Sequence, residues 1–241
     1  MAEHYAVDLD HISRIYRRDE FEIRALDDVT VKVHEGRFVA IMGPSGSGKT
    51  TMLNLIAGID HATSGRVAVG NEEITAMKEP QLAAWRARHI GLVFQFYNLI
   101  PVLTAFENVE LPLLLTPLNK VERRSHVEVA LKAVGLADRM GHYPRQLSGG
   151  QEQRVAIARA IVTDPTIVVA DEPTGDLDAT SAEDILNLLS DLNRHFHKTI
   201  VMVTHDPRAE RFVETIFRLD KGILVGVEAG KGPQIAVAVS G

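Results

Sequence analysis

Four short runs of the chain consist almost entirely of apolar residues, at 38–42, 90–94, 167–170 and 199–204. Near-continuous runs rich in Val and Ile are typical of strands buried on both faces of a parallel sheet. Apolar residues at helical spacing occur between or after them, over 51–57, 151–163 and 182–196. This alternation predicts an α/β fold built on a central parallel sheet.

Two other regions depart from this rhythm. Strand-like segments at 5–9, 25–33 and 66–69 predict a small antiparallel sheet, with an exposed turn at the charged residues 17–20. A hairpin is expected over 217–225, turning at Asp220, Lys221 and Gly222. Residues 101–150 contain no strand-like run, and 122–134 has helical spacing with Gly135 in the position of a C-terminal cap. We therefore expect an inserted helical subdomain at about 96–150.

The stretch between the first apolar run and the first helix fits the pattern G-x-x-x-x-G-K-[ST]. Its glycines let successive backbone N–H groups converge on one anion, and the helix that follows adds positive potential. In this motif the lysine reaches the β- and γ-phosphates, and the hydroxyl after it ligates Mg²⁺. The sequence thus predicts a nucleoside triphosphate site, with contacts from Gly43, Pro44, Ser45, Gly46, Ser47, Gly48, Lys49, Thr50 and Thr51.

The other three apolar runs also end in polar residues. Gln95 follows the second run, Asp171 and Glu172 follow the third, and His205 follows the fourth. Ligands of open α/β sheets bind at the carboxyl ends of the strands. We therefore expect these four side chains to converge near the phosphates held by Lys49.

A second Gly-rich helix start lies at 147–151, where Ser148 is a suitable N-cap. The helix is expected to end at Asp164 and Pro165, because proline cannot continue it. A Gly-rich helix start is a potential anion site. Since the chain already has one phosphate loop, we infer that the second start serves the nucleotide of a neighbouring molecule.

Composition excludes several functional classes. A length of 241 residues fits one large domain or one domain with an insertion, and a net charge of −6 argues against a general nucleic-acid surface. The absence of cysteine excludes disulfides, thiolate metal sites and cysteine nucleophiles. No apolar run reaches the length of a membrane span, and the first residues show no targeting pattern. We expect a cytoplasmic protein that reaches a membrane only through a partner.

Together and in this order, the motifs resemble those of ATP-binding-cassette (ABC) ATPases over about residues 5–228. The matching segments are 43–50 (Walker A), Gln95 (Q-loop), 147–151 (signature), 167–172 (Walker B), 175–178 (D-loop) and His205 (H-loop). The resemblance implies an ATPase domain over 1–228, with a RecA-like P-loop NTPase core, a small antiparallel β subdomain and an inserted α-helical subdomain. It also implies a head-to-tail homodimer, in which each signature segment faces ATP on the other subunit through Leu147, Ser148, Gly149, Gly150 and Gln151.

The same resemblance implies ATP and Mg²⁺ as cofactors and assigns individual roles. Thr50 and Gln95 would ligate Mg²⁺, with Asp171 acting through water. Glu172 would be the general base, and His205 would contact the γ-phosphate.

Outside this catalytic group, Asp178 would belong to the D-loop. Tyr16 fits the aromatic residue that stacks on adenine; the alternative is an ordinary strand-surface tyrosine.

Segment 94–109 and the sequence of 175–178 resemble one branch of the family, the ATPases of macrolide exporters, lipoprotein-releasing systems and the cell-division cassette. Glu152 departs from that branch, which usually has Gln there. The implied function is ATP hydrolysis that powers export or extraction of a macrolide-, lipoprotein-, lipid- or peptide-type substrate. The implied partner is a separate transmembrane permease with few spans and an extracytoplasmic domain, which would hold this chain on the cytoplasmic side of the inner or plasma membrane.

The sequence is also compatible with two alternative functions. One is a mechanotransmission complex of the cell-division type, in which hydrolysis sends a signal across the membrane. Another is a soluble DNA-repair or chromosome ATPase, against which the acidic charge and the absence of cysteine argue. The apolar segment 96–101 is either a docking groove for the partner or local core packing, and the small, Gly-rich tail 229–241 is expected to be mobile.

Overall fold

The computed structural model of the protein describes residues 5–18 and 21–233. Its strands are β1 (Tyr5–Arg18), β2 (Phe21–His34), β3 (Phe38–Met42), β4 (Ser64–Val69), β5 (Glu72–Glu73), β6 (Ile90–Phe94), β7 (Ile167–Asp171), β8 (Thr199–Val203), β9 (Thr215–Asp220) and β10 (Ile223–Ala229). Its α-helices are α1 (Lys49–Ile56), α2 (Glu79–His89), α3 (Ala105–Glu110), α4 (Lys120–Ala133), α5 (Gly149–Ile161) and α6 (Ala179–Phe196). Short 3₁₀ helices are η1 (Leu111–Leu115), η2 (Pro144–Gln146) and η3 (Pro207–Arg211).

The four apolar runs form the centre of a six-stranded sheet, in the order β10-β9-β3-β8-β7-β6. All neighbouring pairs are parallel except β9 and β10. Every residue of β3 and β8 is buried, as a strand covered on both faces requires. The predicted α/β fold with a parallel sheet is confirmed.

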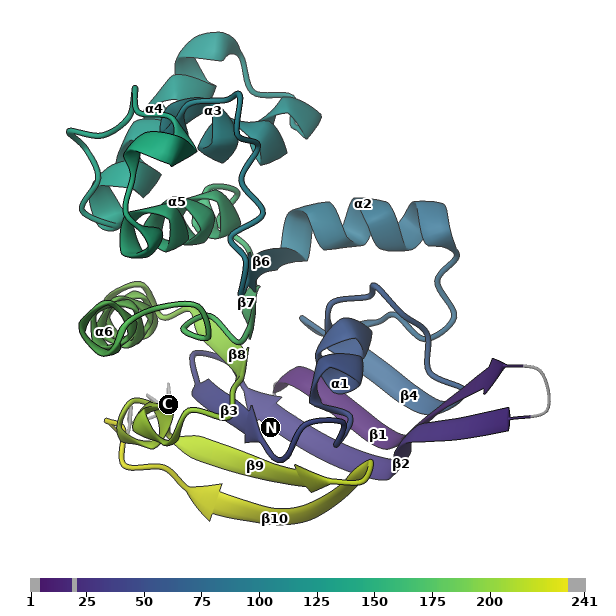
Figure 1. The fold of residues 1–241 in the computed structure, drawn as a ribbon. Coiled ribbons are helices and arrows are strands. Elements are labelled where there is room, and N and C mark those ends of the chain that lie inside the picture. Colours follow the sequence, from purple (N-terminus) through teal and green to yellow (C-terminus); the bar gives the residue numbers. More distant parts are fainter. Residues whose placement is uncertain (1–4, 19–20, 234–241) are drawn as a thin grey trace, which may run out of the picture.

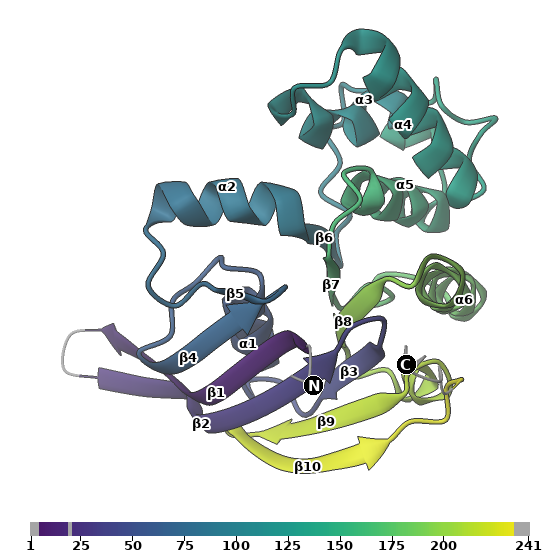
Figure 2. The ribbon, with the colours of Figure 1, turned by 180° about the vertical axis from the view of Figure 1, so that it is seen from behind.

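Alternate residues of the sheet enter two separate cores. Phe38 and Ala40 of β3 pack into a core shared with α5 and α6, whereas Val39 and Ile41 pack into a core shared with α1 and the antiparallel sheet. Figures 1 and 2 show the corresponding layers, with α5 and α6 on one side of the central strands and α1 and α2 on the other. The period-two alternation of side chains along a strand explains this division.

The antiparallel sheet has the order β2-β1-β4-β5, and β1 and β2 form a hairpin much longer than predicted. Its register runs from Tyr5↔His34 to Arg18↔Phe21 and contains several irregularities. Positive φ at His11 and Asp28 marks these bulges, which break the alternation that the prediction relied on.

The turn predicted at 17–20 starts too early, because β1 continues to Arg18. Arg17 belongs to β1 and pairs with Glu22 of β2 across the hairpin, 2.8 Å from Nε to Oε1. Residues 19–20 lie outside the described residues.

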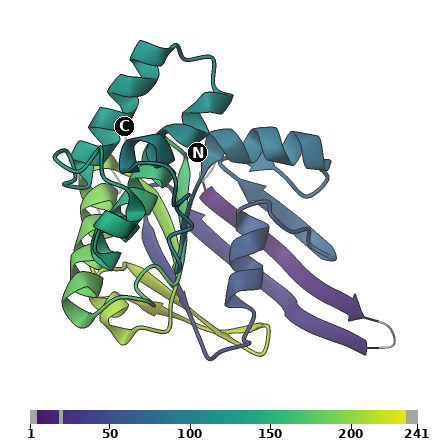
Figure 3. The same cartoon turned by 45° about the horizontal axis from the view of Figure 1, so that its top comes forward.

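The helices α3, α4 and α5 form a separate helical layer, seen at the top of Figure 1 and again in Figure 3. Asn119 caps α4 by accepting from the backbone N–H of Val121 and Glu122, and Gly135 ends it with a φ of +75°. Val127 and Leu131 are buried against α5 and α3 in the shared core. Because α5 packs in this layer too, the helical packing continues beyond residue 150.

One helix, α2, was not predicted. Only Leu82 and Trp85 of this helix are buried, so its apolar stripe is too narrow for periodicity to reveal it. Both side chains lie close to Gly58, which follows α1, and Figure 2 shows α2 above β4. Pro80 in the first turn and the basic residues of the last turn were the available signals.

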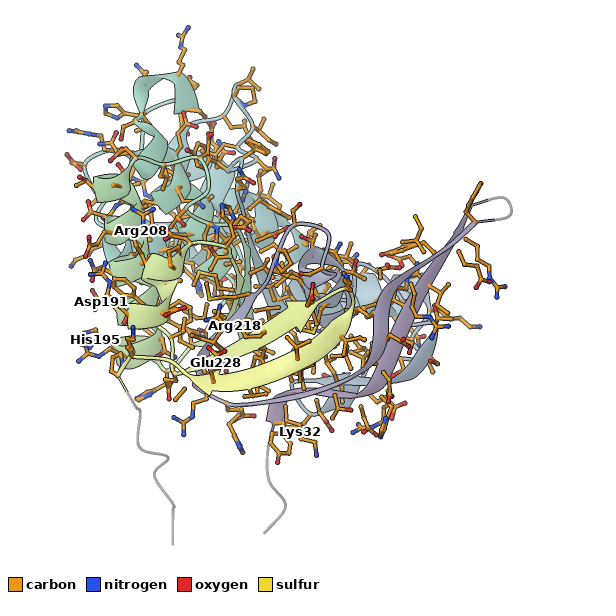
Figure 4. The ribbon with its side chains drawn as sticks, turned by 60° about the horizontal axis from the view of Figure 1, so that its bottom comes forward. Lys32, Asp191, His195, Arg208, Arg218 and Glu228 are labelled. Atoms are coloured by element: carbon orange, nitrogen blue, oxygen red, sulfur yellow. The ribbon has the colours of Figure 1, made fainter. Side chains whose placement is uncertain are left out.

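The C-terminal hairpin β9–β10 turns at Lys221 and Gly222, both with positive φ, which confirms the predicted turn. Arg218 of β9 binds Glu228 of β10 and Glu210 of η3, and Figure 4 shows Arg218 and Glu228 pointing toward each other. Within the tail predicted to be mobile, the backbone N–H groups of 230–232 donate to carbonyls of 210–214. Residues 234–241 lie outside the described residues.

Candidate active site

The phosphate loop, residues 43–50, connects the end of β3 to the start of α1 and requires glycine at several positions. A Cβ on Gly43 would lie 1.9 Å from the carbonyl oxygen of Leu219, and one on Gly48 would lie 2.3 Å from that of Ala25. Gly48 also has a φ of +99°, which side chains rarely permit. The loop therefore packs against β2 and β9 as bare backbone.

The start of α1 is electropositive. Gly48 is its N-cap, so within the described chain no side chain occupies the first amides of the helix. Lys49 is buried, and its ammonium group donates to the carbonyls of Gly43 and Pro44, at 2.9 and 2.8 Å. Open helix amides and a lysine with only neutral acceptors suit a polyphosphate anion.

The donor set also fits Mg²⁺. Thr50 Oγ1 lies 3.4 Å from Asp171 Oδ1, so a hydroxyl of the loop and a carboxylate at the end of β7 lie side by side. Burial is the main cause that raises the pKa of Asp171, with nearby Glu172 adding to it and Thr50 and Lys49 opposing it. A divalent cation would favour the charged carboxylate and so offset the cost of burying it. Among the described residues there is no cluster of three or more His, Asp or Glu of metal-site geometry.

Glu172, directly after β7, is held in an unusual conformation. Its φ is +47°, a left-handed value that costs a non-glycine residue energy and often occurs at functional sites. His205, after β8, fixes its carboxylate twice: Nδ1 lies 2.9 Å from Oε1, and the backbone N–H donates to Oε2 at 3.3 Å. His205 thus contacts both oxygens of the carboxylate.

Gln95, after β6, lies against the loop that follows Glu172. A Cβ on Gly175 would come 3.0 Å from Gln95 Nε2, so the two segments are in contact. The phosphate loop, Gln95, Glu172 and His205 together border one pocket of about 590 Å³. Asp171 contacts this group through Thr50. The strand ends do bring the predicted polar residues together.

The signature segment, residues 147–151, lies elsewhere. Ser148 caps α5 by accepting from the N–H of Gln151, whose side chain accepts from the N–H of Ser148. None of these five residues borders the pocket, and Ser148 and Gly149 are exposed. In Figure 1, α5 lies in the helical layer, apart from α1.

Asp178 caps α6. It accepts from the backbone N–H groups of Thr180 and Ser181 at 3.0 Å each and from the Ser181 hydroxyl at 2.7 Å. The backbone bond from Ser181 is the main cause that holds the pKa of Asp178 below its ordinary value. Ser181 and the neighbouring Leu177 lie close to Gly150 and Gly149, so the predicted D-loop contacts the signature segment.

Comparison with known proteins identifies the family. Residues 26–175 match the family model described as ABC transporter. The chain belongs to the ABC transporter family. An ABC transporter ATP-binding protein of Thermotoga maritima is 45% identical over 222 residues, which cover 92% of this chain and 94% of that protein.

Other relatives agree. The macrolide export ATP-binding/permease protein MacB of Bradyrhizobium diazoefficiens is 45% identical over 217 residues, 90% of this chain but only 33% of that longer protein. The ATP-binding cassette MJ0796 of Methanocaldococcus jannaschii, solved as a dimer bound to ADP and phosphate, superposes with a TM-score of 0.84 at 45% identity, covering 92% of this chain and 98% of that chain. CbiO1 of Clostridium perfringens, part of the ABC transporter complex cbiONQ, superposes at 0.85 with 27% identity, covering 93% and 88%.

The chain is therefore an ABC cassette, the ATP-hydrolysing class of subunit in this family, with the RecA-like core and two smaller parts that the sequence predicted. No helix among residues 5–18 and 21–233 combines the length and apolarity needed to cross a membrane.

The cassette's Tyr16 is not among the residues that border the pocket. Its hydroxyl donates to Asp60 at 2.6 Å, and the Arg14 guanidinium lies over its ring at 4.4 Å. Ile23, Arg24 and Ala25 of β2 border the pocket instead, and Tyr16 pairs with Ile23 across the hairpin. The sequence reasoning missed these β2 residues, because only the hairpin register shows which strand faces the loop.

Proposed function

We propose that this cassette binds ATP at the phosphate loop, hydrolyses it as half of a head-to-tail homodimer, and drives a separate membrane subunit. The observation that carries the proposal is the single pocket in which a phosphate loop faces Glu172, with His205 holding its carboxylate. An anion cradle and an aimed carboxylate are the two elements that phosphoryl transfer to water requires.

Binding uses the backbone first. The amides at the start of α1 would receive the phosphates, and Lys49 would exchange its two carbonyl acceptors for phosphate oxygens. Thr50 and Gln95 would hold Mg²⁺, with Asp171 behind Thr50 through water. The ion, when bound, neutralises charge on the phosphate oxygens.

Glu172 would position and deprotonate the attacking water. Its side chain is only 18% exposed and is held by His205, so little reorganisation is needed when the water binds. His205 is mostly exposed and borders the same pocket as the phosphate loop, where it would contact the γ-phosphate.

The second subunit completes the site. The α5 start is exposed and borders no part of its own chain's pocket. A head-to-tail dimer would place Ser148 and Gly150 against the γ-phosphate held by the partner's Lys49. MJ0796 was solved as a dimer, which supports this arrangement.

The test is the Glu172→Gln variant. We expect ATP-dependent dimerisation, measured by light scattering after size exclusion, with hydrolysis about 10²- to 10⁴-fold slower than in the unmodified chain. The matched control is Glu183→Gln on the surface of α6, which should hydrolyse normally. Unchanged turnover in Glu172→Gln would remove Glu172 from its role, and absence of hydrolysis in the unmodified chain would overturn the ATPase proposal.

We further propose that the partner docks beside the Q-loop. Arg159 donates to the carbonyls of Tyr97 and Asn98, at 2.7 and 2.6 Å, and so fixes this segment. Phe96 and Val102 are 68% and 76% exposed, available to an amphipathic helix of a permease.

Leu99 does not share that exposure. It is half-buried and packs against the main core, so a charge there would disturb folding as well as docking. The test of docking is Val102→Asp, with Val129→Asp on α4, which is also exposed, as the control. Loss of partner binding in Val102→Asp alone supports the surface; equal binding by both variants would exclude it.

Resemblance to the MacB branch favours export or extraction of a macrolide-, lipoprotein-, lipid- or peptide-type substrate, from the cytoplasmic side of the membrane. The second candidate is mechanotransmission of the cell-division type, which the same site would power. Purification from native membranes in mild detergent separates the outcomes. A permease with few spans and an extracytoplasmic domain supports the first two, whereas recovery without a membrane partner favours a soluble ATPase.

A further inference from the structure

Gln153 is a polar residue in an apolar environment. It lies on α5, two residues after the signature segment, and is 0% exposed. The residues that follow it on the helix, Val155 and Ile157, belong to the main apolar core. Burying a polar amide among such neighbours costs free energy unless it is hydrogen-bonded.

The amide of Gln153 bridges two loops of the active site. Its Nε2 donates to the carbonyl of Phe94 at 3.2 Å and to the carbonyl of Pro173 at 2.5 Å. Phe94 directly precedes Gln95, and Pro173 directly follows Glu172. Oε1 has no donor within the described part of the chain. Both amide hydrogens of Gln153 are therefore donated to backbone carbonyls, one beside Gln95 and one beside Glu172.

These two loops depend on each other. Phe94 pairs with Asp171 where β6 and β7 end, and Gln95 lies against Gly175 in the turn that the backbone of Glu172 closes. Glu172 also keeps a left-handed backbone. A strained residue persists only where its surroundings hold it in place.

We propose that Gln153 is a positioning residue that couples the signature helix to Gln95 and Glu172. It touches neither water nor nucleotide itself. When the start of α5 contacts the nucleotide of a second copy, the helix carries the amide of Gln153 with it and sets the two loop carbonyls. This inference rests on the proposed ATP hydrolysis and assigns a positioning residue to the same site.

A purely structural role is the competing explanation, and Asn193 supplies a matched control. Asn193 of α6 is 3% exposed, and its Nδ2 also donates to two carbonyls, those of Gly36 and Lys198, at 2.7 and 2.8 Å. Gly36 and Lys198 precede β3 and β8, at the opposite ends of these strands from the phosphate loop. Losing the Asn193 amide should therefore cost stability without disturbing the site.

The experiment compares Gln153→Met with Asn193→Leu, both of similar volume to the original side chain. We expect Gln153→Met to lower kcat roughly 10- to 100-fold while the KM for ATP changes less than twofold, because misplaced groups slow chemistry more than binding. Asn193→Leu should keep its kcat. The melting temperature of Gln153→Met should fall no further than that of Asn193→Leu, since the unpartnered oxygen disappears with the amide.

Hydrogen exchange gives a readout that does not depend on activity. Peptides covering 94–98 and 172–175 should exchange faster in Gln153→Met than in the unmodified chain, and should not change in Asn193→Leu. Unchanged exchange in both loops, or a kcat loss shared equally by both variants, would overturn the coupling. Failure of ATP hydrolysis in the unmodified chain would instead sink the ATPase proposal, and the exchange result would still decide the positioning role.

Discussion

The chain contains two Gly-rich helix starts, and they are built differently. At α1, Gly48 leaves the helix amides uncapped, and β2, Gln95, Glu172 and His205 surround the loop to make a pocket. At α5, the reciprocal bonds of Ser148 and Gln151 cap the helix, and its start does not border that pocket.

The difference indicates where each anion contact is completed. The first start is open to a ligand and enclosed by its own chain, so one cassette suffices to bind a nucleotide. The second start is capped as a helix end but exposed, so we expect it to act on another molecule. Disrupting the α1 start should abolish ATP binding. Disrupting the α5 start should leave ATP binding intact and stop hydrolysis.

The largest effect is expected from Gly48→Ala. The new Cβ would lie 2.3 Å from the carbonyl oxygen of Ala25 on a backbone of φ +99°, so the loop must move. We expect ATP affinity to fall at least about 100-fold, the effect of roughly 2.7 kcal/mol. Titration with a fluorescent ATP analogue measures it. Gly46→Ala is the control, because its Cβ meets no atom within 4 Å and only the backbone strain at φ +77° remains. Equal affinities for both variants would contradict the packing argument.

A smaller effect, confined to turnover, is expected from Gly150→Asp. A carboxylate at the second start repels a phosphate of the partner, so hydrolysis should fall about 100-fold while ATP affinity stays within about twofold. Steady-state phosphate release and the same titration measure the two quantities. Mixing the Gly150→Asp variant with the Lys49→Ala variant should restore part of the activity. One site of the mixed dimer then combines an unmodified phosphate loop with an unmodified α5 start. Absence of recovery would contradict a site shared between subunits.

The smallest effect concerns stability. Burial raises the pKa of Asp171, so its charged form penalises the nucleotide-free fold at pH values above that raised pKa. Asp171→Asn removes the charge and should raise the melting temperature at pH 7 by no more than about 2–4 °C, the shift that 1 kcal/mol produces in a protein of this size.

The gain should shrink as pH falls through the raised pKa, because Asp171 is then protonated and neutral as well. Thermal unfolding of both proteins from neutral to mildly acidic pH measures this convergence. A gain that persists unchanged at acidic pH would show that charge burial is not its cause.

Local signals predicted which residues gather at the site. The spacing of Gly43, Gly48 and Lys49 predicts the phosphate loop, and Gln95, Glu172 and His205 after three apolar strands border the same pocket. They converge because the carboxyl ends of parallel strands share one sheet edge.

Other parts of the site could not be predicted. Ile23, Arg24 and Ala25 of β2 border the pocket, which the sequence did not indicate, since bulges in the β1–β2 pair shift the register. Tyr16 pairs with Ile23 but does not border the pocket, and its stacking on adenine stays a prediction. Gln153 resembles any polar residue of a helix until its two carbonyl partners, far apart in sequence, are seen.

By itself, the sequence determined which residue types stand at each turn, most of the strands and helices, and the order of the motifs. Periodicity and glycine placement are local properties, so the chain displays them directly. The tertiary structure alone decided which strand borders the phosphate loop, that the side-chain amide of Gln153 bridges the carbonyls of Phe94 and Pro173, and that the α5 start is exposed. These outcomes depend on strand register and packing between distant segments, and a linear pattern does not contain them.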